Sequence, residues 1–123
     1  MLKNVNIKCG DYNECDSFID SRTFVYIDPP YRPLNATSSF TSYAKSEFGD
    51  EQQIQLLHFI EKISQKGAKV IASNSDPKNI NKEDNFFDDI YKMFKIKRVS
   101  ATRMINSHSD GRGTISELLI CNY

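Results

Sequence analysis

The chain contains few of the residues that would place it in several large classes of protein. Its three cysteines, Cys9, Cys15 and Cys121, include no CxxC pair, and an odd number does not build a disulfide framework. We therefore expect a protein of the reducing cytoplasm. The two histidines, His58 and His108, do not combine with the cysteines at the spacing of a metal site, so no metal is predicted.

An excess of charge of one sign and long apolar segments are also absent. Lysine and arginine number 16, as do aspartate and glutamate, so the 123 residues carry no formal net charge. Any contact with DNA must therefore depend on local charge. No apolar run approaches the roughly 20 residues that span a bilayer, and Met1–Asn6 lacks the apolar core of a signal peptide. We expect a soluble protein of one domain at most, with no membrane partner.

The most informative segment is Asp28-Pro29-Pro30-Tyr31, which directly follows the apolar run Phe24–Ile27. The run predicts a strand that is covered on both faces. The tetrapeptide then lies at the carboxyl end of this strand, which is the edge where open α/β sheets bind ligands. By itself, the tetrapeptide is equally consistent with a simple turn.

The same four residues suit the transfer of a methyl group to the amino group of a nucleobase. The lone pair of that nitrogen is delocalised into the ring, so its hydrogens must be accepted by other groups. The carboxylate of Asp28 and the carbonyl of Pro29, which the prolines hold in place, are suitable acceptors. Asp28 also offsets the positive charge that develops on nitrogen. Tyr31 can stack on a base that has left the duplex, which is worth about 1–3 kcal/mol.

Several blocks of the sequence resemble Dam-like DNA adenine methyltransferases, especially those of GATC-type restriction-modification systems. The blocks follow one another in the order typical of the family: Asp28–Tyr43, Gly67–Pro77, Asn85–Asp88, Arg103–Ser107 and Glu117–Tyr123. The resemblance covers nearly the whole chain. It implies S-adenosyl-L-methionine as the methyl donor, double-stranded DNA as the substrate and the exocyclic amino group of adenine as the acceptor.

Two parts of the family pattern are missing. The family is expected to begin with a Phe-x-Gly-x-Gly loop that holds S-adenosylmethionine, followed by a target-recognition segment, and none of the five glycines forms that loop. We interpret residues 1–123 as the carboxyl-terminal catalytic portion of a methyltransferase, either a fragment or half of a split enzyme with a companion chain. The expected fold is α/β, a partial Rossmann-like S-adenosylmethionine-dependent methyltransferase fold with parallel strands, helices and a carboxyl-terminal antiparallel β-hairpin.

Candidate cofactor residues precede and follow the first apolar run. The segment Val5–Cys9 alternates weakly, which predicts a short strand that ends at Gly10. The resemblance implies that the next two residues, Asp11 and Tyr12, lie beside the adenine of S-adenosylmethionine, and Asp28 is a third candidate for contact with the cofactor. An N-cap role for Asp11 in the following turn is at least as good an interpretation.

A long polar segment over residues 32–48 follows the tetrapeptide and contains three candidates for contact with DNA. The segment is longer than the connectors of compact domains, so we predict that it closes over the target. Arg32, Phe40 and Tyr43 are the candidate residues. The two aromatic side chains could instead anchor the segment on the core.

Two helices and a hairpin complete the predicted scaffold. Asp50–Gln53 resembles a capping box, apolar residues follow at helical spacing, and Gly67 ends the helix. Glu83–Phe94 predicts a second amphipathic helix whose aromatic residues belong to the core. The runs Ile96–Ile105 and Thr114–Cys121 predict a β-hairpin with a long polar tip.

Three further residues are candidates for contact with DNA or the target base. Asn74 follows the predicted strand Lys69–Ala72, at the same sheet edge as the tetrapeptide. Asn106 and Arg112 belong to the hairpin tip, where Arg112 between two glycines can approach a phosphate closely. A flexible, exposed tip is an equally good interpretation.

Two other functions remain open from the sequence. The chain could be an inactive, truncated remnant that serves as an interaction module, or it could methylate an amino group on RNA or protein. The strand that ends at Asp28 is also expected to leave an unpaired apolar edge, and such edges aggregate or recruit a partner.

Overall fold

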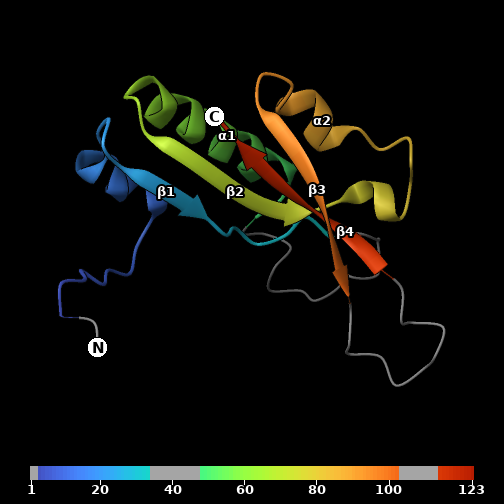
Figure 1. Ribbon diagram of the computed structural model, residues 1–123, viewed down its shortest axis with the longest axis horizontal. Helices are drawn as coiled ribbons and strands as arrows, with labels where there is room; N and C mark the ends of the chain where they lie inside the picture. Colours follow the sequence, from blue (N-terminus) through green and yellow to red (C-terminus); the bar gives the residue numbers. More distant parts are fainter. Residues whose placement is uncertain (1–2, 34–47, 103–113) are drawn as a thin grey trace.

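The computed structural model describes residues 3–33, 48–102 and 114–123. These residues form a four-stranded sheet in the order β1-β2-β4-β3, with helices packed against it (Figure 1). The sheet combines parallel and antiparallel strands, which confirms the α/β fold expected from the sequence.

The parallel part of the sheet consists of β1 (Phe24–Ile27) and β2 (Lys69–Ser75). The two strands are in register from Phe24 opposite Lys69 to Ile27 opposite Ala72. Both strands therefore end at the same edge, and β2 extends past β1 by three residues, Ser73 to Ser75. This extension places a polar segment directly beside the loop that leaves β1.

The antiparallel part is the predicted hairpin, formed by β3 (Lys95–Thr102) and β4 (Thr114–Cys121). The two strands pair from Lys95 opposite Cys121 to Thr102 opposite Thr114. β4 also pairs with β2, where Ser75 lies opposite Glu117. The hairpin therefore completes the sheet on the side of β2 away from β1.

α1 (Asp50–Gln65) supplies a large part of the core that supports the sheet. It begins after Gly49, whose N–H donates to Gln52 Oε1 at 2.8 Å. The helix ends before Gly67, which adopts a left-handed φ of +93° that a side chain would strain. Buried apolar residues of α1 then pack against the sheet and α2: Leu56, Leu57, Phe59, Ile60 and Ile63.

The core also contains the aromatic residues that the sequence assigns to it. Phe87 and Tyr91 are almost completely buried, and Phe94 packs edge to face against Tyr91 with ring centroids 5.7 Å apart. However, α2 covers only Phe86–Ile90, so the predicted helix over Glu83–Phe94 is too long. The chain turns after Ile90 because Phe94 enters the core just before β3 begins.

Two other structural predictions are wrong. Val5–Cys9 is not a strand, and Val5 and Ile7 are exposed; a 3-10 helix, η1 (Tyr12–Phe18), follows this segment instead. β1 is not covered on both faces, because Phe24 and Tyr26 are more than half exposed while Val25 and Ile27 are half-buried. Within the described residues, β1 pairs with β2 alone and forms an edge of the sheet.

None of the helices in the described parts of the chain is long and apolar enough to cross a membrane.

Candidate active site

The segment Asp28-Pro29-Pro30-Tyr31 leaves the carboxyl end of β1, where its prolines end the strand because they cannot donate to a neighbouring strand. Asp28 is exposed, and Tyr31 is 38% exposed. Burial raises the pKa of Tyr31, so its phenol remains neutral well above physiological pH. The loop thus presents one carboxylate and one neutral aromatic ring at the edge of the sheet.

Three consecutive polar residues at the end of β2 hold this loop. Ser73 Oγ donates to Asp28 Oδ1 at 3.1 Å, and Ser75 Oγ donates to the carbonyl of Arg32 at 2.7 Å. Between them, Asn74 Oδ1 accepts the backbone N–H of Arg32 at 3.1 Å. All three side chains are buried. Asn74 therefore lies beside the tetrapeptide, as the sequence predicts, and its side chain binds the loop itself.

Gln53 also contacts the loop, a role that is not predicted from the sequence. Its side chain is completely buried, and Nε2 donates to the carbonyl of Pro30 at 3.1 Å. A signal was present in the sequence, because Gln53 precedes Leu56, Leu57 and Ile60 at the spacing of the buried helix stripe. An amide in such a stripe needs a buried partner, and the loop supplies one.

Arg32 is engaged by the protein itself in this structure. Its Nε lies 2.7 Å from Asp50 Oδ1 and its Nη1 lies 3.0 Å from Asp84 Oδ2, while the guanidinium stacks 4.3 Å from the ring centre of Phe86. The pKa of Arg32 is raised, and the hydrogen bond with Asp50 is the main cause. Burial acts to raise the pKa of Asp84, but the Phe86 N–H and Arg32 lower it overall. Arg32 thus ties the loop to α1 and to the segment before α2, and contact with DNA stays a prediction.

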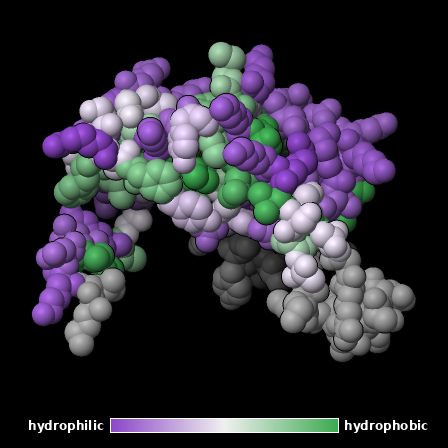
Figure 2. Space-filling view, viewed as in Figure 1, coloured by the Kyte–Doolittle hydropathy of each residue, from purple (hydrophilic) through white to green (hydrophobic). Residues whose placement is uncertain are grey.

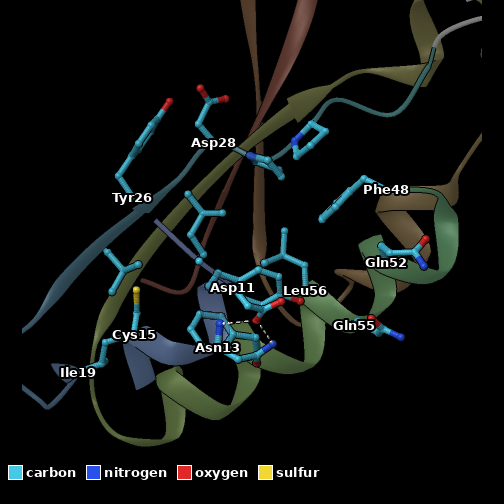
Figure 3. Close-up of a pocket in the computed structure, with 17 residues that line it drawn as sticks. Asp11, Asn13, Cys15, Ile19, Tyr26, Asp28, Phe48, Gln52, Gln55 and Leu56 are labelled. Atoms are coloured by element: carbon cyan, nitrogen blue, oxygen red, sulfur yellow. Dashed lines mark hydrogen bonds between the residues drawn. The ribbon is translucent and has the colours of Figure 1, made fainter. Parts of the chain in front are cut away.

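A cavity of about 560 Å³ lies beside the loop that follows β1 (Figure 3). Figure 3 shows Asp28 at its rim and Asp11 across from it, on the segment that leads into η1. Pro29 and Pro30 line the cavity beside Asp28, while Tyr12 lines it beside Asp11. Three regions supply the remaining lining. The first is Gly10 with residues of η1, the second is β1, and the third is Phe48 with one face of α1.

The structure therefore brings the three candidate cofactor residues, Asp11, Tyr12 and Asp28, around one cavity. Asp11 also caps η1, because its Oδ1 accepts the backbone N–H of Asn13 at 2.8 Å and the Asn13 side chain at 2.7 Å. These bonds lower the pKa of Asp11 and keep the carboxylate ionised. Burial raises the pKa of Tyr12, whose ring packs edge to face on Phe59 at 5.0 Å.

Tyr31 lies away from this cavity. It lines a small depression with residues of β2 and β4, among them Ser75 and Ser116. Asp28 and the prolines therefore line the cavity, whereas the Tyr31 ring does not. The loop can thus present a carboxylate to a group donor in the cavity and an aromatic ring to a flat acceptor.

Four candidate residues, Phe40, Tyr43, Asn106 and Arg112, lie outside the described residues, so their roles stay predictions. Among the residues that are described, no group of three or more His, Cys, Asp or Glu side chains could hold a metal ion.

Comparison of the sequence with known families shows which proteins the chain is related to. The profile of the D12 class N6 adenine-specific DNA methyltransferases matches residues 1–105. The chain belongs to this family. The loop at the end of β1 and the residues that line the cavity beside it lie within the matched part of the chain.

Curated relatives support the same family. The chain is 51% identical, over 100% of its length, to the type II methyltransferase M.MjaIII of Methanocaldococcus jannaschii, and covers 41% of that protein. It is 35% identical over 98% of its length to the type II methyltransferase M1.LlaDCHI of Lactococcus lactis subsp. cremoris, covering 40% of it. It is also 32% identical over 95% of its length to the DNA adenine methylase of Escherichia coli K12, again covering 40%. The chain thus spans about two fifths of the length of these relatives.

Proposed function

We propose that residues 1–123 are the carboxyl-terminal catalytic portion of a DNA adenine N6 methyltransferase of a restriction-modification system. This portion transfers a methyl group from S-adenosyl-L-methionine to the exocyclic amino group of an adenine that has left the duplex. The observation that carries the proposal is that Asp28 lines a large cavity, while Tyr31 of the same loop lies outside it and is 38% exposed. Family membership supports the same reaction.

The cavity fits S-adenosylmethionine in size and in chemistry. Its volume of about 560 Å³ lies within the range of small-molecule and cofactor sites. The cofactor carries amino and hydroxyl donors, and the carboxylates of Asp11 and Asp28 are acceptors on opposite sides of the cavity. Tyr12, supported by Phe59, offers an aromatic surface for the adenine ring. When bound, the cofactor supplies an electrophilic methyl group on a positively charged sulfur.

The loop supplies the groups that activate the amino nitrogen. Because Ser73 holds Oδ1 of Asp28, the carboxylate has a fixed orientation from which it accepts one N–H of the adenine. The carbonyl of Pro29 accepts the other N–H, and Tyr31 stacks on the base. If the nitrogen accepted this methyl group, positive charge would develop on it, and Asp28 would stabilise that charge. The surplus proton then leaves the nitrogen through Asp28 to solvent.

A further segment, supplied by an amino-terminal half or by a companion chain, is proposed to cover β1. The relatives are more than twice as long as this chain. Phe18, Phe24 and Tyr26 are each more than half exposed, and they line or border a second hollow beside β1. Figure 2 shows hydrophobic residues interrupting the hydrophilic surface in the region that carries β1. An additional strand would pair with the edge of β1 and bury this surface.

Transfer of a labelled methyl group from S-adenosylmethionine to unmethylated duplex DNA tests the proposed function. The chain is assayed alone and after addition of the amino-terminal portion of a related methyltransferase. We expect Asp28→Ala to lower the rate by at least about 10²-fold, because the acceptor carboxylate is lost. Asp89→Ala, which removes an exposed carboxylate on α2, is the matched control and should keep the wild-type rate.

The outcome separates the alternatives. Methyl transfer to DNA that is lost in the Asp28 variant supports the proposal. Methyl transfer that occurs on RNA or protein but not on DNA contradicts the substrate. Binding of DNA without any methyl transfer, alone or with the added portion, identifies an inactive interaction module.

A further inference from the structure

Gln53 of α1 and Asn74 of β2 form a closed ring of hydrogen bonds with the loop. Gln53 Nε2 donates to the carbonyl of Pro30 at 3.1 Å. Gln53 Oε1 accepts from Asn74 Nδ2 at 3.0 Å, and Asn74 Oδ1 accepts the N–H of Arg32 at 3.1 Å. The ring therefore runs from the residue before Tyr31 to the residue after it, through two side chains that lie 21 positions apart.

Burial makes this ring costly to break. Gln53 is 0% exposed and Asn74 is 3% exposed, and a buried amide without a partner costs roughly 1–3 kcal/mol. The backbone also decides which end of each amide faces which partner. The carbonyl of Pro30 can only accept, so it requires the amino group of Gln53, and the N–H of Arg32 can only donate, so it requires the oxygen of Asn74. One arrangement satisfies all four groups at once.

Both peptide groups that flank Tyr31 are held by this ring. The Pro30 carbonyl belongs to the peptide before Tyr31, and the Arg32 N–H belongs to the peptide after it. We propose that Gln53 and Asn74 are a positioning pair that fixes the orientation of Tyr31 and thereby the plane on which the target base stacks. The stacking role rests on the proposed function, whereas the fixing of the backbone does not.

The position of the pair allows its effect on the loop to be separated from a general effect on the stability of the fold. Neither Gln53 nor Asn74 lines the cofactor cavity, so their loss should leave cofactor binding unchanged. A second amide, Asn122, holds the opposite end of β2 in a similar manner. Its Oδ1 accepts the N–H of Val70 at 2.8 Å and its Nδ2 donates to the carbonyl of Ala68 at 2.8 Å. Asn122 therefore provides a matched control that stabilises the sheet without contact to the loop.

Hydrogen exchange of the Arg32 backbone amide, followed by NMR on the whole chain, tests the fixing of the backbone. We expect Gln53→Met to speed exchange at Arg32 by at least about tenfold, because Asn74 Nδ2 loses its acceptor and the Pro30 carbonyl loses its donor. Asn122→Leu should leave exchange at Arg32 unchanged while it lowers Tm. Met retains the length and helix propensity of Gln in the apolar stripe, so the variant is expected to fold.

A second variant, Gln53→Glu, adds a rescue. Burial favours the protonated carboxyl group, which keeps one donor for Pro30 and one acceptor for Asn74. Protection of the Arg32 amide, corrected for its intrinsic rate, should therefore return as the pH is lowered from about 8 to about 5. No such return is expected in Gln53→Met.

Methyl-transfer kinetics then test the effect on the base. The positioning role predicts that Gln53→Met lowers kcat by about 10²-fold with an unchanged KM for S-adenosylmethionine, because a small displacement of the stacking plane is costly. Asn122→Leu should keep the wild-type kcat below its Tm.

The proposal is overturned if the Arg32 amide exchanges at the same rate in the wild type and in Gln53→Met. It is also overturned if a variant loses protection of this amide but keeps the wild-type kcat. If the wild-type protein transfers no methyl group under any condition, the proposed function fails. The exchange measurement still decides whether the pair fixes the backbone.

Discussion

A neighbouring hydroxyl group orients the carboxylate of Asp28. Ser73 is 4% exposed, and its Oγ lies 3.1 Å from Asp28 Oδ1 and 3.5 Å from the carbonyl of Ile27. The hydroxyl thus connects the carboxylate to the end of β2, on which the loop rests. Without this bond, the exposed carboxylate of Asp28 would sample several rotamers.

We therefore expect Ser73→Ala to lower the rate of methyl transfer about tenfold, since orientation of the acceptor carboxylate is lost but its charge remains. The free energy of unfolding should fall by only about 1 kcal/mol, the typical net value of one hydrogen bond. Single-turnover kinetics and urea denaturation measure the two quantities. Ser21→Ala, an exposed serine at the opposite end of β1, is the control, and an equal loss of rate there would contradict the argument.

The sequence predicts the residues of the loop better than it predicts their partners. Asp28 and Tyr31 can be identified because a strand, two prolines and an aromatic residue follow one another in the chain. The partners of Arg32 cannot, because Asp84 is 52 positions away and reaches the guanidinium only after folding. The partners of Gln53 cannot be identified for a related reason, since one lies in the loop after β1 and the other lies in β2.

At the scale of elements, ion pairs attach η1 to α1. Lys62 Nζ lies 2.9 Å from Asp16 Oδ2, and Lys66 Nζ lies 2.6 Å from Asp16 Oδ1. This attachment matters for the site because η1 and α1 line the same cavity. Lys66 and Lys62 lower the pKa of Asp16 below its ordinary value.

The lowered pKa of Asp16 gives the attachment a definite dependence on pH. A carboxylate whose pKa is lower in the folded state stabilises that state above its unfolded pKa of about 3.9, and this stabilisation disappears as the pH falls through the folded pKa. We expect Asp16→Asn to have a lower Tm than wild type at pH 7, and the two Tm values to converge below about pH 4. Thermal denaturation followed by circular dichroism across this range measures the difference. A constant difference at every pH would show that the ion pairs do not stabilise the fold.

Elements were predictable where one local signal governs them. α1 follows from its apolar stripe and from Gly67, and the hairpin follows from two alternating runs. The end of α2 depends instead on tertiary packing, because Tyr91 and Phe94 enter the core from a turn rather than from a helix. The coil at Val5–Cys9 shows the same limit, since a strand requires a neighbour and the described residues provide none.

At the scale of the whole molecule, three exposed apolar residues gather beside β1. Phe18, Phe24 and Tyr26 are between 57% and 64% exposed and line the same hollow. By contrast, Met93 is 85% exposed but lies in the turn between α2 and β3. A cluster of this kind beside an unpaired strand edge favours association with another chain.

The isolated chain should therefore self-associate in solution, with a sedimentation coefficient that rises with protein concentration. Phe24→Lys places a charge on the β1 edge, so it should shift the chain toward monomer, because natural edge strands are protected in this way. Met93→Lys is the matched control and should leave association unchanged, since it adds the same charge far from β1. Sedimentation velocity at several concentrations distinguishes the three proteins. A wild-type chain that is monomeric at every concentration and unfolds cooperatively would show that the surface around β1 needs no partner, and the proposed covering segment would then lose its physical basis.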